Sequence, residues 1–149
     1  MKKILIFLVG VFLFFLNQNL LAEIISQSYG SFYSTDISTL TVNADYTTES
    51  DAINLKYINA ISVHAYGIAQ STNALSNITV YLISSPDGTH WDTLPFTHFH
   101  FVISDTTTAV MQGALIDTVG IQQIKILKIN NANASDEIYD FNCYWAAKE

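Results

Sequence analysis

The chain has 149 residues, of which 13 are acidic and six are lysines, so that its formal net charge is −7 without any arginine. Half of the residues are apolar and 13% are charged, which excludes a disordered chain and supports a single hydrophobic core. Nucleic acids and anionic lipid surfaces bind clustered basic residues, so both are excluded as partners. Neutral glycans and proteins, including a second copy of this chain, remain as partners.

Residues 1–22 have the pattern of a secretory signal peptide. Lys2 and Lys3 form a basic start, Ile4–Leu16 is an apolar run, and Ala22 is a small residue before the expected cut. The run is shorter than the ~20 residues that span a bilayer, although an uncleaved N-terminal anchor is the alternative. We expect a secreted, periplasmic or extracellular protein with no membrane span after the leader. Removal of the leader leaves four lysines and 13 acidic residues, which give a formal net charge of −9.

The remaining chain divides into residues 23–50 and residues 51–149. The first segment is rich in Ser and Thr and is expected to form the first strand of the same domain. The alternative is an arm that adds to a sheet edge of a neighbouring subunit. Beyond Glu23 the chain alternates apolar and polar residues and is rich in β-branched and aromatic side chains. We predict strands at Ile37–Val42, Ala52–Tyr57, Ala60–Ile68, Asn77–Ser84, Pro95–Ile103, Thr107–Ile116, Ile121–Ile129 and Ile138–Ala146.

These short strands predict an all-β fold, a two-sheet antiparallel β-sandwich of jelly-roll type. Alternation places Val80 and Leu82 on the core face of their strand. The same rule places Ile124, Ile126 and Lys128 together on one face of a later strand.

The only cysteine is Cys143, so no disulfide can form within the chain. We expect Cys143 to be a buried apolar thiol, with an intermolecular disulfide as the alternative.

The segment Ser85-Pro86-Asp87-Gly88-Thr89-His90-Trp91 predicts a tight turn after a strand. Pro86 fixes φ, the Asp87 side chain can bond its own backbone, and Gly88 accepts a positive φ. This Ser-x-Asp-Gly-x-x-Trp corner resembles that of discoidin-like (galactose-binding-like) jelly-roll modules. The resemblance implies a non-catalytic sandwich that binds glycans, lipids or proteins through loops at one end. The later strand of that family usually carries arginine, which this chain lacks.

A small carbohydrate-binding module is therefore the alternative function. An aromatic face beside Asn and Asp side chains suits a neutral glycan. Two loops offer this combination, and their candidate residues are Asp87, His90 and Trp91 in the first and Asn131, Asn133 and Asp136 in the second. The oxygen atoms of the same loops also suit Ca²⁺.

His98 and His100 form the candidate metal site. Residues at i and i+2 project from the same face of a strand about 7 Å apart. Two imidazoles at that spacing bind Zn²⁺ or Cu²⁺ when a third ligand arrives, for which His90, His64 and Asp92 are the candidates. The His-x-His pattern is similar to that of cupins, whose downstream glutamate is missing here. Solvent-facing strand positions without a metal are the alternative.

Catalytic motifs are missing from the sequence. It has no Gly-x-Ser-x-Gly elbow and no glycine-rich phosphate loop. We therefore expect no enzyme and no cofactor. The predicted function is that of a non-catalytic secreted structural or interaction protein, such as a surface, matrix or appendage subunit that self-associates.

Overall fold

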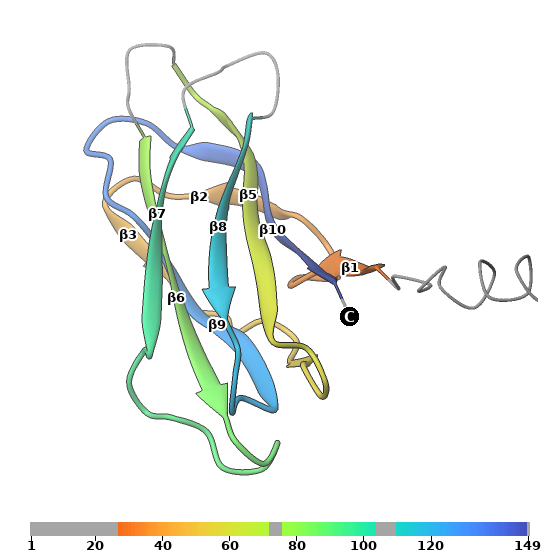
Figure 1. Cartoon of the computed structure of the whole chain (residues 1–149). Coiled ribbons are helices and arrows are strands. Elements are labelled where there is room, and N and C mark those ends of the chain that lie inside the picture. Colours follow the sequence, from red (N-terminus) through yellow and green to blue (C-terminus); the bar gives the residue numbers. More distant parts are fainter. Residues whose placement is uncertain (1–26, 72–75, 104–109, 149) are drawn as a thin grey trace, which may run out of the picture.

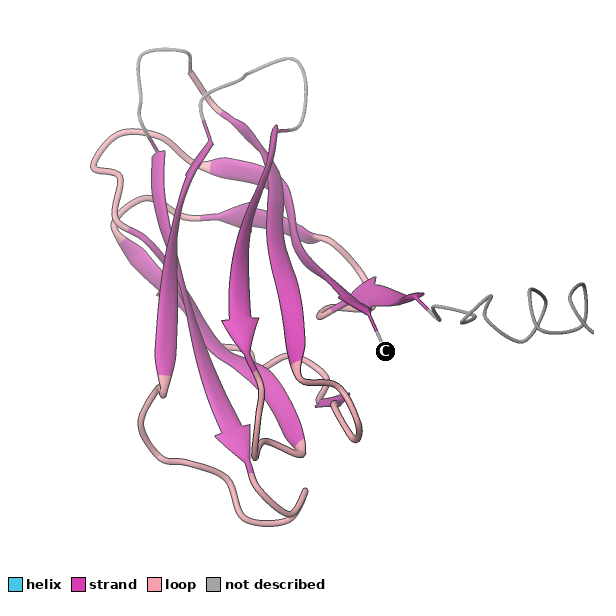
Figure 2. Cartoon of the chain, in the orientation of Figure 1, coloured by secondary structure: helices cyan, strands magenta, loops and turns pink. Residues whose placement is uncertain are grey.

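The computed structural model describes residues 27–71, 76–103 and 110–148, in which every regular element is a β-strand (Figures 1 and 2). The predicted signal peptide, residues 1–22, lies outside the described residues. Within the described part, the chain has no helix that is long and apolar enough to cross a membrane. The strands are β1 (Gln27–Ser31), β2 (Ile37–Leu40), β3 (Ala44–Tyr46), β4 (Ile53–Asn54), β5 (Ala60–Ala69), β6 (Ser76–Ser85), β7 (Thr97–Ile103), β8 (Val110–Asp117), β9 (Gln123–Asn131) and β10 (Ile138–Lys148).

The strands form two antiparallel sheets packed face to face. Sheet A has the order β1-β10-β5-β8, with β2 also paired to β10. Sheet B has the order β3-β9-β6-β7, with β4 also paired to β9. From β4 onward the chain passes from one sheet to the other at every connection except the β6–β7 hairpin. This alternation between sheets is the connectivity of a jelly roll, and it confirms the predicted fold class.

The Ser/Thr-rich N-terminal segment contributes strands to both sheets. β1 and β2 pair with β10, and β3 pairs with β9, all in antiparallel register. Phe32 and Tyr33, between β1 and β2, belong to the core, with 0% and 8% of their surface exposed. Residues 27–50 therefore lie in the sandwich of their own chain, since the backbone of β1 is hydrogen-bonded to β10.

The core lies between the two sheets and is built from the inward positions of the alternating strands. Val63, Val80 and Phe101 are each 2% exposed or less. As predicted from the alternation, Ile78 and Leu82 share the inward face with Val80, and all three are fully buried. Because the inward residues are long aliphatic and aromatic side chains on both sheets, they interdigitate to form one continuous core.

A bulge in β9 changes which residues of that strand face the core. The register shifts where Tyr81 and Leu82 of β6 face Lys128 and Ile126 of β9, which leaves Leu127 as the extra residue. Ile126 and Ile129 are both buried, and Lys128 lies on the outer face. The prediction that Lys128 shares a face with Ile126 is therefore wrong, because a bulge breaks the period of two.

The predicted strand Ala52–Tyr57 is largely wrong. Only β4, Ile53–Asn54, is paired, and the following residues form a turn in which the Ile58 amide donates to the Leu55 carbonyl at 2.8 Å. Tyr57 has a φ of 75°, a left-handed conformation that does not occur in a strand. Leu55 and Ile58 are buried, so apolar residues that resemble a strand in sequence instead close the end of the core.

Candidate functional site

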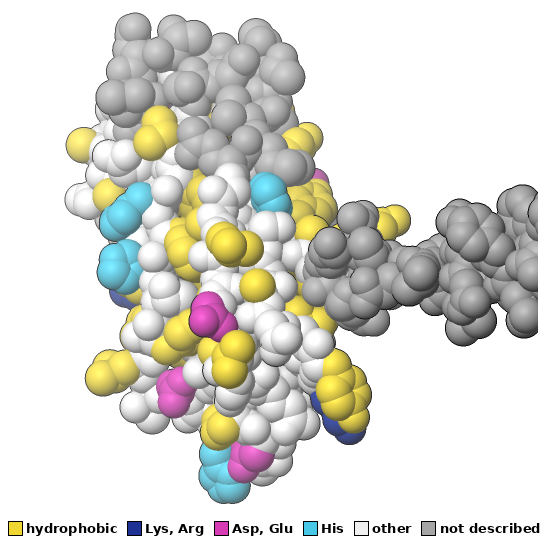
Figure 3. Space-filling model, viewed as in Figure 1, with side chains coloured by type: hydrophobic (Ala, Val, Ile, Leu, Met, Phe, Trp, Pro, Cys, Tyr) yellow, Lys and Arg dark blue, Asp and Glu magenta, His cyan; other side chains and the backbone are white. Residues whose placement is uncertain are grey.

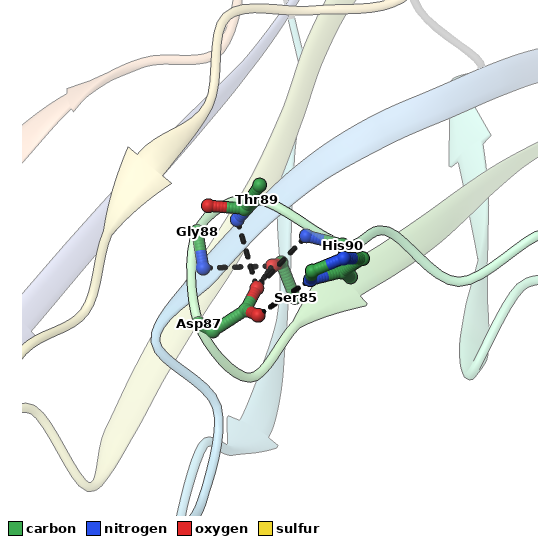
Figure 4. Close-up of polar contacts among 5 residues, drawn as sticks. All are labelled: Ser85, Asp87, Gly88, Thr89 and His90. Carbon is green, nitrogen blue, oxygen red and sulfur yellow. Dashed lines mark hydrogen bonds and ion pairs between the residues drawn. The ribbon is translucent and has the colours of Figure 1, made fainter.

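The predicted turn after β6 is present and is built around the Asp87 carboxylate (Figure 4). Its Oδ1 accepts hydrogen bonds from the backbone amides of Thr89 and His90, both at 2.8 Å. Its Oδ2 lies 2.7 Å from Nδ1 of His90. The Gly88 amide, at a φ of 76°, donates to the Ser85 hydroxyl at 2.8 Å. The Asp87 carboxylate and Nδ1 of His90, which were candidates to bind a ligand, thus form hydrogen bonds within the turn.

The electrostatics of this turn agree with its geometry. The two backbone amides, led by that of His90, and the His90 imidazole hold the pKa of Asp87 well below its usual range. The hydrogen bond from His90 to Asp87, together with the carboxylate charge, raises the pKa of His90. Asp87 is therefore a weak base, and it accepts bonds within its own loop.

Trp91 is tied to the sandwich by a lysine from β9. The Lys125 Nζ lies 4.5 Å from the centre of the Trp91 ring and also forms an ion pair with Glu49. The Lys125 ammonium therefore covers one face of the Trp91 ring, and the side chain is only partly exposed.

The second predicted ligand-binding loop lies at the other end of the sandwich. β6 and β9 run antiparallel, with Ser85 opposite Gln123 and Ile78 opposite Asn131. The Ser85–Trp91 corner and the Asn131–Asp136 loop therefore begin at opposite ends of these strands. The structure does not bring the two sets of candidate residues together.

Side chains of the Asn131–Asp136 loop bond one another and the neighbouring backbone. Asn131, which is 1% exposed, donates from Nδ2 to the carbonyls of Leu40 and Asp136 at 3.1 and 3.0 Å. The Asp136 carboxylate accepts hydrogen bonds from Ser71, Ser135 and Asn133, which lower its pKa. These contacts fold the loop and fasten it to β2.

His98 and His100 lie on the outer face of sheet B, as the alternation predicted, and both are exposed. Their ring centres are 5.3 Å apart. The candidate third ligands are elsewhere: His90 is in the β6–β7 loop, and His64 is on β5 of sheet A. No group of three or more His, Cys, Asp or Glu residues within the described part of the chain is placed to hold a metal ion.

Cys143 is fully buried in the core between the sheets. Burial raises the pKa of its thiol well above the usual range. Because the nucleophilic form of cysteine is the thiolate, this environment makes the side chain unreactive. The expectation of a buried apolar thiol is confirmed.

The outer face of sheet A carries a surface that the sequence did not indicate. One row of residues crosses four strands in register: Leu115 on β8, Ser62 on β5, Ala146 on β10 and Tyr29 on β1. Leu115 and Tyr29, at the two ends, are 76% and 82% exposed, and the two residues between them are small. A hollow of about 330 Å³ lies over this row, and we call the row and its hollow the sheet A surface.

The next row makes a second hollow beside the first. It runs from Gly113 through His64 and Tyr144 to Ser31. A Cβ atom added at Gly113 would lie 2.5 Å from Cε1 of His64, so the glycine leaves the space that the His64 ring occupies. The second hollow, about 440 Å³, is lined by residues that include Tyr29, Tyr144 and Trp145. The two hollows share Tyr29 and Ala146 and form one continuous surface.

No protein-family model and no curated protein sequence matches the chain. Its structure is similar to that of the SPBc2 prophage-derived protein YomS, with 8% identity, a TM-score of 0.49 and coverage of 83% of this chain and 94% of that one. It is similar to VP2 of infectious bursal disease virus in a subviral particle, with 12% identity and a TM-score of 0.47, over 83% of this chain but only 32% of VP2. It is also similar to the Yersinia pseudotuberculosis-derived mitogen, with 14% identity and a TM-score of 0.30, over 83% and 86% of the two chains. The jelly-roll fold of this chain rests on its own strand order.

Proposed function

We propose that the protein is an exported, non-catalytic structural subunit that self-associates through the sheet A surface. The observation that carries the proposal is the row in which exposed Leu115 and Tyr29 flank the small residues Ser62 and Ala146. Exposed apolar side chains beside a hollow mark a surface that binds a partner.

Charge favours a second copy of the chain as this partner. The full chain has a formal net charge of −7, which becomes −9 when the predicted leader with Lys2 and Lys3 is removed, so two copies repel each other over most approaches. Among the described residues, those that line the two hollows include no Asp, Glu or Lys. Contact centred on these hollows therefore buries apolar area without placing acidic side chains inside them, and exposed Asp117 of β8 lies at their border beside Ala60.

The row is also suited to a two-fold symmetric contact. In such a contact the same patch is used by both copies, so a protrusion must meet a depression of the same patch. Leu115 of one copy fits the floor formed by Ser62 and Ala146 of the other. Burying a leucine side chain contributes about 1.5–3 kcal/mol, and a symmetric dimer gains this contribution twice.

The environments of the Cys143 thiol and the Asp87 carboxylate support a non-catalytic role. The Cys143 thiol is buried and its pKa is raised, which is opposite to the shift that a nucleophilic cysteine needs. The Asp87 carboxylate has a lowered pKa and accepts hydrogen bonds from its own turn. Neither group is suited to general-base or nucleophilic chemistry.

Export is supported by the amino-terminal sequence alone. The Lys2-Lys3 start and the apolar run Ile4–Leu16 are typical of a signal peptide. We expect the exported protein to begin at Glu23, which N-terminal sequencing of protein from the extracytoplasmic fraction tests. A chain that keeps Met1 would contradict cleavage and favour the anchored alternative.

Self-association is tested by size-exclusion chromatography with light scattering over a concentration series. We expect the mass to rise from one chain to two with concentration. Leu115→Asp places a charge on the sheet A surface and should keep the protein monomeric. The matched control is Leu94→Asp, because Leu94 is 75% exposed but lies in the β6–β7 loop. A monomer at every concentration, or equal loss in both variants, would contradict the proposal.

A neutral glycan is the second candidate for the same surface. Tyr29, Tyr144 and Trp145 line one hollow together with Ser31, and aromatic rings with hydroxyl groups suit sugars. On a glycan array, Tyr29→Ala would abolish binding at this surface, whereas Trp91→Ala would not. Loss of binding in Trp91→Ala alone would instead place glycan recognition at the β6–β7 corner.

A further inference from the structure

The outer face of sheet B carries two neighbouring histidines that the proposed function does not use (Figure 3). We propose that His98 and His100 form a two-histidine site for a divalent transition-metal ion, with Cu²⁺ bound most tightly. The site lies on β7, an edge strand of sheet B, and is distinct from the sheet A surface.

The spacing of the two imidazoles fits a shared ion. Their ring centres are 5.3 Å apart and the rings are nearly perpendicular, at 81°. A ligating nitrogen lies at the ring edge and about 2.0–2.1 Å from the metal, so each ring centre lies on the order of 3 Å from the ion. Two rings separated by 5.3 Å can therefore ligate one ion at an open, near-tetrahedral angle.

Both rings are held by residues of the neighbouring strand β6. The Thr79 hydroxyl lies 2.9 Å from Nδ1 of His100, and Thr79 is only 4% exposed. This bond engages Nδ1 and leaves Nε2 of His100 for the metal. A hydrogen bond to the second ring nitrogen is the usual way in which proteins orient a metal-binding histidine.

The His98 ring is positioned by an aromatic contact. It lies against Tyr81, with ring centres 5.7 Å apart and a tilt of 31°. Tyr81 is covered on its ring by the Lys128 ammonium at 4.9 Å, and Lys128 is paired with Asp45 at 2.7 Å. The chain of contacts continues across the sheet to β3 and limits the movement of His98 before a metal arrives.

The two imidazole ligands determine which class of metal ion the site would bind. Imidazole nitrogen suits Cu²⁺, Ni²⁺ and Zn²⁺, and affinity among the divalent ions is highest for Cu²⁺. The described residues hold no group of three His, Cys, Asp or Glu, so this part of the chain supplies two ligands at the site, and we infer that water occupies the other coordination positions. Hard ions that need several oxygen ligands, such as Ca²⁺, are disfavoured.

The test is a Cu²⁺ titration of the purified full chain, followed by calorimetry and electron paramagnetic resonance. We expect one Cu²⁺ per chain at this site, with hyperfine splitting from two imidazole nitrogens. His98→Ala and His100→Ala should each lower the affinity on the order of 100-fold, because linking two weak groups creates the site, and the double variant should bind no copper at this position. The α-amino group contributes the same background binding to every variant.

His90→Ala is the matched control, because His90 is an exposed imidazole that lies outside the pair. It should leave the site unchanged. Thr79→Val removes the hydroxyl at nearly constant shape and should weaken Cu²⁺ binding by about 10-fold or more, while Thr79→Ser restores it. The proposal is overturned if each single variant loses half of the bound copper at unchanged affinity, since the histidines would then bind independently. Binding that is unchanged in the double variant would also overturn it.

Discussion

The outer faces of the two sheets differ although their inner faces are alike. On sheet A, one row reads Leu115, Ser62, Ala146 and Tyr29, with large residues outside and small residues between them. On sheet B, the corresponding row reads Asp45, Asn130, Thr79 and His100, each of which can form hydrogen bonds. The first row leaves a hollow whose described lining residues carry no carboxylate or lysine, and the second row contains two side-chain hydrogen bonds, from Asn130 to Asp45 and between Thr79 and His100.

This difference indicates that the inward-facing and outward-facing side chains of each strand have separate roles. Inward positions on both sheets are aliphatic or aromatic and give one core, so they determine the fold. Outward-facing positions need not be apolar, and they carry different kinds of side chain on the two sheets. An uncharged hollow suits association with a second acidic copy, whereas oriented imidazoles suit a metal ion.

The largest expected effect concerns the polar residue buried on the outer side of sheet A. Asn142 is 2% exposed, and its Nδ2 donates to the Tyr33 carbonyl at 3.1 Å and to the Asp36 carboxylate at 2.8 Å. Asn142→Ala leaves both acceptors without this donor and should lower the free energy of unfolding by about 2–3 kcal/mol. Chemical denaturation measures this change.

Asn77→Ala is the control for this variant, because Asn77 is an exposed asparagine on β6 of sheet B. Its free energy of unfolding should stay within about 0.5 kcal/mol of the wild-type value. If the two variants are equally stable, Asn142 does not fasten residues 33–36 over sheet A.

A smaller effect is expected from the charges of sheet B. Lys128 lies 2.7 Å from the Asp45 carboxylate, and this hydrogen bond, followed by that from Asn130, lowers the pKa of Asp45. Lys128→Met should cost about 0.2–1 kcal/mol of stability at low salt, because both side chains are about one-third exposed. The cost should shrink in 1 M NaCl, where screening is strong.

High salt should affect the outer face of sheet A differently from the ion pair on sheet B. Association through the sheet A surface is apolar and should persist or strengthen at high salt, since mutual repulsion of the acidic copies is screened. Dissociation of the dimer by 1 M NaCl would show that ion pairs hold the two copies together.

The smallest effect belongs to the exposed turn between β6 and β7. The pKa of His90 is raised by Asp87, so this pair stabilises the turn at pH values below the unfolded His90 pKa and stops doing so as the pH rises through its folded value. The pKa of Asp87 is lowered, so its contribution is lost only when the pH falls through that depressed value. Asp87→Asn should return the pKa of His90 to its usual range in an NMR titration. An unchanged His90 pKa would contradict the pairing in Figure 4.

The inward pattern could be predicted from the sequence because it repeats within single strands. Ile78, Val80 and Leu82 show the period of two directly, and the Pro86–Gly88 turn has its own local chemistry. The β9 bulge could not be predicted, because the extra residue is defined only by its pairing with β6.

The sheet A surface was invisible in the sequence for a related reason. Tyr29, Ser62, Leu115 and Ala146 are far apart along the chain and come together only through the registers of three strand pairs. No single strand shows the large-small-small-large order. The histidine pair was visible because both residues lie on one strand, whereas its orientation by Thr79 depends on the pairing of β7 with β6.

The most direct test of the account compares two tyrosines of equal exposure. Tyr29 on the sheet A surface is 82% exposed, and Tyr57 in the β4–β5 turn is 83% exposed. Tyrosine nitration, followed by mass spectrometry at low and high protein concentration, measures how each ring is covered. We predict that Tyr29 becomes protected as the concentration rises and that Tyr57 reacts equally at both concentrations. Equal reactivity of Tyr29 at both concentrations would contradict self-association through sheet A.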